Sequence, residues 1–217
     1  INRQNEVIQI KWDDKNLEGS VDLQWLPPTV REVDMTNNGL YGSLDLPALP
    51  DSLEVLHMYD NNFECTLDVT ALPTKLREFS LFRNNFYGEI RLKNLPNRIK
   101  IFDVSQNHLS GPLDLVDLPD TLVKLSFYGN EFTGSVCLTS LPFSLEVLSL
   151  AKNKLSGTLD LTRLPKKMKR LFLNSNDFYG VTDFSKVDHL DYFNVSHNPE
   201  LGGNHPKAMY RFRSWRL

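Results

Sequence analysis

Residues 30–53 have the sequence VREVDMTNNGLYGSLDLPALPDSL, and this stretch decides the fold. Apolar and polar residues alternate through Val33 and Met35, and Asn38 follows three residues later. Alternation with a period of two predicts a short strand with one buried face. One such strand cannot bury its apolar face alone, so the stretch must pack against similar neighbours.

The same pattern returns every 23 residues along the chain. One position of the pattern is an Asn in every copy but the first, where it is Lys15. The step to the last copy is 22 residues instead of 23. A repeat of this length and regularity predicts a solenoid, in which stacked copies bury a continuous core. The marker residues are Asn38, Asn61, Asn84, Asn107, Asn130, Asn153, Asn176 and Asn198.

The copies share the form L-x-x-L-x-L-x-x-N-x-L-x-G-x-L-x-L-x-x-L-P. Its first part resembles the leucine-rich repeat, and the resemblance covers residues 7–201 in nine copies. It implies a right-handed solenoid of the α/β-horseshoe class that is mostly β, with a parallel concave sheet of about nine short strands. The return segment is similar to repeats of protists such as trypanosomatids and, more distantly, to plant-type repeats.

We expect one domain, residues 1–217. Residues 1–14 would form an N-terminal cap and the first strand, residues 15–201 the repeats, and residues 202–217 a C-terminal cap or an extension. A proline recurs once per copy in the return segment, which excludes regular helices there. The alternating pieces at 43–46 and 158–161 predict a second short strand between the Gly and the Pro of each copy.

Two further columns of residues suggest how a coil is held. An Asn amide has two donors and two acceptor lone pairs, so the Asn column is predicted to bond backbone groups of its own coil and of the next. A Gly four residues after the Asn recurs in seven copies, and Cys65 takes its place in another. A cysteine in register suggests that close packing, more than a positive φ, explains this column.

The residues six, four and two places before the Asn are expected to face outward from the concave sheet. A solvated sheet face would be almost entirely polar, whereas these columns contain many aromatic and aliphatic residues. Such a group predicts an interface for a protein or peptide. The predicted contact residues are Asp34, Val55, His57, Tyr59, Glu78, Phe82, Ile101, Asp103, Tyr128, Val147, Arg170, Phe172 and Tyr192.

Charge is uneven along the chain. Residues 1–108 contain 11 Lys or Arg and 16 Asp or Glu, whereas residues 109–217 contain 13 and 11. On the concave face the acidic residues lie toward the N-terminal copies, and Lys124, Lys152 and Arg170 lie toward the C-terminal ones. The expected partner is therefore apolar in the middle with an opposite charge gradient. The basic C-terminal end is either a solvated end or a docking surface for an acidic partner.

The formal net charge of −3 gives no sign of nucleic acid or of an anionic membrane as a partner, and a monomer is expected. Cys65 and Cys137 lie three repeats apart, about 14 Å by strand spacing, which is too far for a disulfide. Free thiols and the lack of cysteine-rich caps favour a cytoplasmic location. No membrane span or secretory signal is visible, but the chain starts at Ile1 rather than Met, so a surface or secreted location stays open.

We find no motif that carries chemistry. The five histidines have no metal-ligand spacing, and nucleophile, phosphate-loop and dinucleotide motifs are missing from the sequence. No catalytic residue, cofactor or metal is predicted. An Asp column seven places after the marker (Asp22, Asp45, Asp68, Asp114, Asp160 and Asp183) favours hydrogen bonds to turn amides over calcium.

The predicted function is a non-enzymatic protein-protein interaction module. One alternative is a structural subunit of a large assembly, and another is the recognition domain of a larger surface protein or enzyme. An assembly subunit should have apolar patches on its return side as well as on its concave face. The sequence of the return side is polar, which favours the free module.

Overall fold

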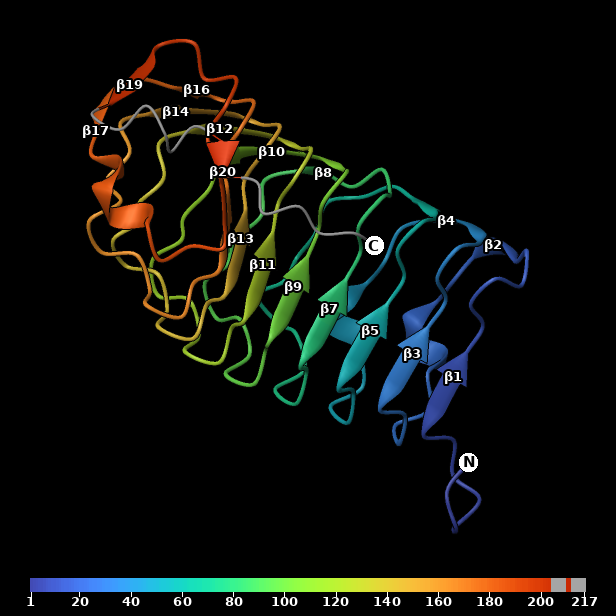
Figure 1. The fold of residues 1–217 in the computed structure, drawn as a ribbon. Coiled ribbons are helices and arrows are strands. Elements are labelled where there is room, and N and C mark those ends of the chain that lie inside the picture. The colour runs from blue at the N-terminus through green and yellow to red at the C-terminus, as the bar shows by residue number, and fades with distance from the viewer. Residues whose placement is uncertain (204–209, 212–217) are drawn as a thin grey trace.

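The computed structural model describes residues 1–203 and 210–211. The expected C-terminal cap or extension therefore lies largely outside the described residues. The described part is a solenoid of stacked coils, with the strands of its main sheet side by side across the front of Figure 1. Each coil contributes one strand to this sheet, and most coils add a second short strand along the top edge in the same view.

The main sheet contains nine parallel strands, and the expectation of about nine short strands is confirmed. Pairing joins residues one repeat apart, as in Glu32 with Val55 and Val55 with Glu78. A tenth strand, β20 (Tyr210–Arg211), pairs antiparallel with β18 at the C-terminal edge. The parallel strands are β1 (Gln9–Lys11), β3 (Glu32–Asp34), β5 (Val55–His57), β7 (Glu78–Ser80), β9 (Ile101–Asp103), β11 (Lys124–Ser126), β13 (Val147–Ser149), β15 (Arg170–Phe172) and β18 (Tyr192–Asn194).

The second strands form smaller parallel sheets just after the Asn position. One sheet has the order β2-β4-β6, another runs from β8 to β16, and β17 pairs with β19. Their bounds are β2 (Glu18–Ser20), β4 (Gly39–Gly42), β6 (Asn62–Phe63), β8 (Tyr87–Gly88), β10 (His108–Pro112), β12 (Glu131–Gly134), β14 (Lys154–Gly157), β16 (Asp177–Phe178), β17 (Gly180–Thr182) and β19 (Leu201–Gly203).

The second strand predicted at 43–46 and 158–161 is therefore misplaced. Neither segment is a strand; β4 ends at Gly42 and β14 ends at Gly157. In 158–161 the reason lies in Asp160, whose carboxylate bends the chain by accepting hydrogen bonds from the residue two places on. Asp160 Oδ1 accepts from Thr162 N at 2.9 Å and from Thr162 Oγ1 at 2.6 Å. This local turn competes with a strand ladder. In 43–46 the reason differs, because Asp45 makes no such bond and a 3-10 turn with Pro47 in its first turn begins at Leu46.

Short 3-10 turns take the place of helices on the return side. They are η1 (Leu23–Trp25), η2 (Leu46–Ala48) and η3 (Phe184–Val187), and the described residues contain no α-helix. Asp22 and Asp183 cap two of them by accepting the amide two residues ahead. The prediction from the repeated prolines, a return segment without regular helices, is confirmed for this part of the chain.

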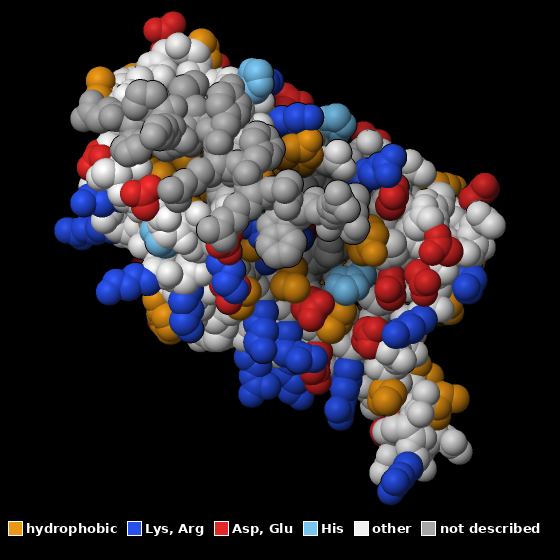
Figure 2. All heavy atoms as spheres, viewed as in Figure 1, with side chains coloured by type: hydrophobic (Ala, Val, Ile, Leu, Met, Phe, Trp, Pro, Cys, Tyr) orange, Lys and Arg blue, Asp and Glu red, His pale blue; other side chains and the backbone are white. Residues whose placement is uncertain are grey.

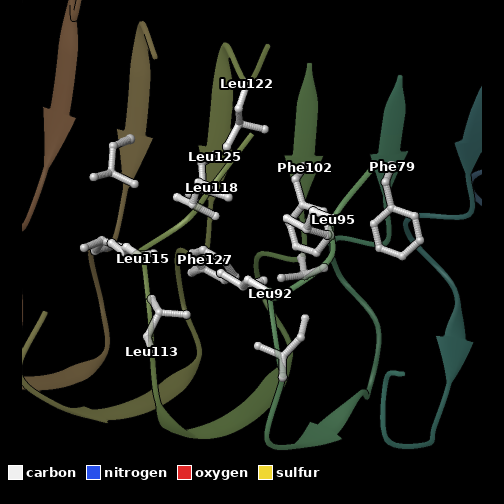
Figure 3. Packing of buried hydrophobic residues seen from close by; sticks show 14 of the residues in the cluster. Phe79, Leu92, Leu95, Phe102, Leu113, Leu115, Leu118, Leu122, Leu125 and Phe127 are labelled. Carbon is white, nitrogen blue, oxygen red and sulfur yellow. The ribbon is translucent and has the colours of Figure 1, made fainter. Parts of the chain in front are cut away.

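The core runs through the whole stack. Phe79 and Phe102 lie on neighbouring strands with ring centroids 5.1 Å apart, and both are fully buried. Figure 3 shows these rings and the leucines of the return segments, including Leu113 and Leu115, in one layer between the strands and the return side. Each coil thus buries its apolar face only by contact with its neighbours.

The Gly column corrects the packing argument made from the sequence. All seven members have a positive φ, as at Gly134 with φ +77°. A Cβ added at Gly134 would meet nothing within 4 Å, so close packing does not select glycine at this position. Backbone conformation does, because an L residue is strained at such a φ. Cys65, which takes the Gly position in its coil, does not have a positive φ. The second strand of that coil, β6, has only two residues.

The N-terminal end of the stack remains partly open. Residues 1–8 form a loop beyond β1, where a cap was expected. Trp12 and Trp25 are 49% and 84% exposed, and the end has an apolar hollow of about 570 Å³. Its lining includes Val7, Ile10, Trp12, Val21, Trp25 and Met35.

Candidate protein-binding interface

The concave face is organised by strand alternation. From β3 to β18 the middle side chain of each strand of the main sheet is buried and the two outer ones point away from the core, as in β5, where Leu56 is buried between Val55 and His57. In β1 the middle residue, Ile10, is only partly buried. The register keeps equivalent positions side by side through the stack. A predicted column is therefore a continuous row of side chains in space.

An aromatic pair stands at the centre of the N-terminal half of this face. The Tyr59 and Phe82 rings stack with centroids 4.6 Å apart and planes inclined by 19°. The His57 ring lies 6.1 Å from Tyr59, and His57 Nε2 is 3.4 Å from Glu78 Oε2. All four side chains are half-buried, so each keeps an accessible edge. Aromatic surface that stays accessible beside charged groups suits contact with another polypeptide.

A second aromatic pair lies near the C-terminal end of the sheet. Phe172 and Tyr192 have centroids 4.8 Å apart, and they line a hollow of about 590 Å³ with Lys169, Arg170 and Asp191. The Arg170 side chain is exposed at this hollow. The hollow therefore offers an aromatic wall beside a cation.

The middle coils differ from the expectation at one residue. Asp103 was expected to be a contact residue, but it is buried, and its carboxylate is already engaged. It accepts hydrogen bonds from the backbone and hydroxyl of Ser105, and Lys124 Nζ lies 2.8 Å from its Oδ2. Ile101, Tyr128 and Val147 are half-buried.

Charges on the concave face run in the expected order. Acidic side chains gather on the N-terminal part, at the right of Figure 2. Glu32 and Asp34 lie in this part of the chain, on β3. Asp34 also accepts from Thr36 N at 3.1 Å, and Lys11 pairs with Glu32 at 3.2 Å. Toward the other end the Lys152 ammonium lies 5.3 Å from the centre of the Tyr128 ring.

The Asn column lies at the inner turn of each coil, behind this face. Asn107 Nδ2 donates to Leu81 O, Val104 O and Ser105 O, each at 3.1 Å. Its Oδ1 accepts from Phe86 N at 3.0 Å. The bonds thus join each coil to the preceding one rather than to the next. From Asn61 onward all the column's asparagines are buried.

Apolar side chains are also exposed away from the concave face, so the expectation of a polar return side is wrong. Tyr41, Tyr87 and Tyr179 occupy one position, three residues after the Asn, and are about half exposed. Tyr41 lies on β4 and Tyr87 on β8, and Tyr179 lies between β16 and β17. Phe143 is 61% exposed on a turn, with Lys167 above its ring. The sequence could have predicted this exposed row, since the three tyrosines stand at the same position of their repeats.

The Asp column has no arrangement suited to a metal ion. Within the described residues, no group of three or more His, Cys, Asp or Glu side chains is close enough to hold one. Asp68 instead accepts from the backbone and hydroxyl of Thr70, and these bonds lower the pKa of its carboxyl. Cys137 takes the Asp place in its coil, with Sγ 3.3 Å from Thr139 Oγ1. Cys65 and Cys137 are both free, as the strand spacing predicted.

Solved structures resemble this solenoid, although its sequence matches no protein-family model and no curated protein. The leucine-rich repeat ectodomain of the membrane receptor kinase GASSHO1/SCHENGEN3 from Arabidopsis thaliana is 28% identical, with a TM-score of 0.75. That alignment covers 88% of this chain and 24% of the receptor chain, which was solved in complex with CASPARIAN STRIP INTEGRITY FACTOR 2.

Two further plant proteins show the same shape. The peptide hormone receptor RGFR1, solved in complex with RGF2, is 23% identical over 87% of this chain and 34% of its own, with a TM-score of 0.71. A plant ice-binding protein is 25% identical over 83% and 61%, with a TM-score of 0.66. The narrower likeness to trypanosomatid repeats stays a prediction. Among the described residues, no helical turn has the length and apolar character needed to cross a membrane.

Proposed function

From its fold as a leucine-rich repeat solenoid, we propose that this chain is a non-enzymatic module that binds a protein or peptide on its concave face. The observation that carries the proposal is the stacked pair of Tyr59 and Phe82, half-buried on the concave face. Rigid aromatic side chains give large contact area at low entropic cost.

A structural neighbour supports binding as the role of this shape. GASSHO1/SCHENGEN3, with 28% identity, was solved with a bound factor. This chain spans a quarter of that receptor chain, so the receptor's activity and partner are not transferred. What the likeness supports is a scaffold whose surface recognises another molecule.

Two groups on the concave face that have acid-base chemistry take part in structural contacts. His57 pairs with Glu78, and Asp103 is held by Ser105 and Lys124. A general base needs a free lone pair directed at a substrate proton. These contacts support recognition over catalysis, and the proposed module needs no cofactor.

The partner's chemistry follows from the order of the side chains. Acidic residues at the N-terminal coils attract cations, and Arg170 at the other end attracts an anion. We propose a partner with a basic part, an apolar middle and an acidic part. The overall negative charge disfavours nucleic acid, and the module would act as a monomer.

The exposed tyrosines at and beside the second strands favour one alternative function. A subunit of a larger assembly needs apolar contact surface on more than one side, and Tyr41, Tyr87 and Tyr179 provide it. In that case partner capture would depend on these tyrosines rather than on Tyr59 and Phe82.

Affinity capture with three baits separates the two functions. The baits are the parent chain, the variant Tyr59→Ala/Phe82→Ala, and the matched variant Tyr41→Ala/Tyr87→Ala, each followed by mass spectrometry. We expect partners captured by the parent to be lost with the first variant and kept with the second. The reverse pattern would support the assembly subunit and reject the concave interface.

A further inference from the structure

A basic cluster lies within the acidic half of the chain. Residues 75–100 contain seven Lys or Arg and only two Asp or Glu, although residues 1–108 carry an acidic excess. Lys and Arg side chains gather along the lower edge of the face in Figure 2. We name the basic edge cluster as Lys75, Arg77, Arg98 and Lys100, all exposed.

The backbone places these four cations in two adjacent coils. Lys75 and Arg98 hold the same position in equivalent turns, where Leu76 N donates to Pro73 O and Ile99 N donates to Pro96 O. Lys100 N donates to Arg77 O at 2.8 Å, so these two residues are direct neighbours across strands. Coils are about 4.8 Å apart, so the four residues form a compact two-by-two array.

Two cations along this edge form ion pairs with a Glu of the preceding coil, and the cluster lacks such a carboxylate at Lys100. At the position before each strand, Arg77 pairs with Glu54 of the preceding coil at 3.0 Å, and Lys169 pairs with Glu146 of the preceding coil at 2.6 Å. Lys100 has no such carboxylate, because its neighbours at this position are Arg77 and Val123.

The other two cations resemble Lys100 in this respect. Within residues 1–203 and 210–211, the side chains of Lys75, Arg98 and Lys100 make no ion pair and no hydrogen bond. Like charges held this close favour the arrival of an anion.

Acidic residues limit the size of that anion. Asp51 and Asp120 occupy the turns of the coils on either side of the cluster. A long polyanion laid across the coils would meet these carboxylates. A short segment would not, since the cluster is two coils wide, about 10 Å with its side chains.

We propose that the basic edge cluster binds a short run of Asp or Glu side chains in a protein partner. The carboxylates would take the place that Glu54 takes beside Arg77. This inference rests on the proposed function and adds to it, because β7 and β9 start at the cluster and their coils contribute Phe82 and Ile101 to the concave face. One partner could therefore contact the basic edge cluster and the concave face together.

A labelled hexaglutamate peptide tests the cluster by fluorescence anisotropy at low ionic strength. The cluster variant is Lys75→Gln/Arg98→Gln/Lys100→Gln. The matched control, Arg163→Gln/Lys166→Gln/Lys186→Gln, removes the same number and kind of exposed cations elsewhere. We expect the Kd to rise about tenfold for the cluster variant and to stay within about twofold for the control. An equal rise in both variants, or none in the cluster variant, would overturn the proposal.

Two further arms make the result specific. Tyr59→Ala/Phe82→Ala should bind hexaglutamate like the parent, so failure of the concave interface and failure of the cluster remain distinguishable. A heparin-derived hexasaccharide should bind less tightly than hexaglutamate, and tighter binding through the same cluster would reject a carboxylate-bearing protein segment as its partner. If the triple variant does not fold, Lys100→Gln alone must weaken hexaglutamate binding, and an unchanged Kd would count against the proposal.

Discussion

Tyr59 and Phe82, one repeat apart in sequence, stack face to face with ring centroids 4.6 Å apart. Both are half-buried, whereas Phe79 on β7 and Phe102 on β9 lie on the inner side of the sheet and are fully buried. The contrast separates surface recognition from core packing. The loss of stability in alanine variants therefore tests whether an aromatic side chain belongs to the surface or to the core.

The double variant Tyr59→Ala/Phe82→Ala should lose little stability. An aromatic pair on a half-exposed face contributes about 0.5–1.5 kcal/mol beyond area burial. Phe79→Ala, by comparison, should lose about 3–5 kcal/mol, because it leaves a cavity in the core. Chemical denaturation of the two variants measures the difference. Similar losses would mean that Tyr59 and Phe82 belong to the core.

Asn107→Ala should destabilise the whole solenoid without changing any exposed surface. The variant leaves the buried Phe86 amide and the Leu81 carbonyl without their partner from the next coil. Each buried polar group left unpaired costs about 1–3 kcal/mol. Thermal unfolding measures the loss, with Asn62→Ala as control because Asn62 is exposed. Equal melting temperatures for the two variants would contradict the role of the Asn column.

The two free thiols should react at different rates. Hydrogen bonds from Thr139 lower the pKa of the exposed Cys137 thiol, whereas burial raises the pKa of Cys65. A lower pKa gives more thiolate, the reactive form, at a given pH. Mass spectrometry of iodoacetamide labelling against pH should therefore show Cys137 alkylated at lower pH than Cys65. Thr139→Val should move the Cys137 profile to higher pH, and an unmoved profile would remove Thr139 as the cause.

The turn made by Asp160 should weaken in acid. Hydrogen bonds from Thr162 lower the pKa of this exposed carboxyl below its ordinary value of 3.8. A depressed folded-state pKa means that the stabilisation is complete above the ordinary value and is lost as pH falls through the lower one. Carbon-detected NMR titration should find this low pKa, and Thr162→Val should raise it. An unchanged pKa in that variant would mean that the Thr162 hydroxyl does not hold the carboxylate.

The fold was largely predictable because one signal repeats. The L-x-L alternation and the constant step placed the nine parallel strands and their register. The second strand was misplaced at 43–46 because alternation alone ignores two local effects. Gly42 takes a φ of +92°, and a 3-10 turn with Pro47 in its first turn begins at Leu46. At 158–161 the Asp160 side chain turns the chain by accepting hydrogen bonds from Thr162. A hydrogen bond between a side chain and the backbone leaves no trace in the pattern of apolar residues.

The candidate face was predictable as columns but not as contacts. Strand alternation identified which residues leave the core, and it placed Tyr59 beside Phe82. It did not show that Ser105 and Lys124 contact the Asp103 carboxylate, since this depends on side-chain lengths in two adjacent coils. The basic edge cluster was missed for a different reason. Charge summed over half the chain hid seven cations within residues 75–100.

Photo-crosslinking from a residue of the concave face tests whether a partner binds there. Phe82 is replaced by a benzoyl-phenylalanine analogue, and the same analogue replaces Tyr87 on the second strands as control. After irradiation with captured partner, the account predicts a crosslink from position 82 and none from position 87. Crosslinks from position 87 alone would contradict it and would place the binding surface on the side of the solenoid.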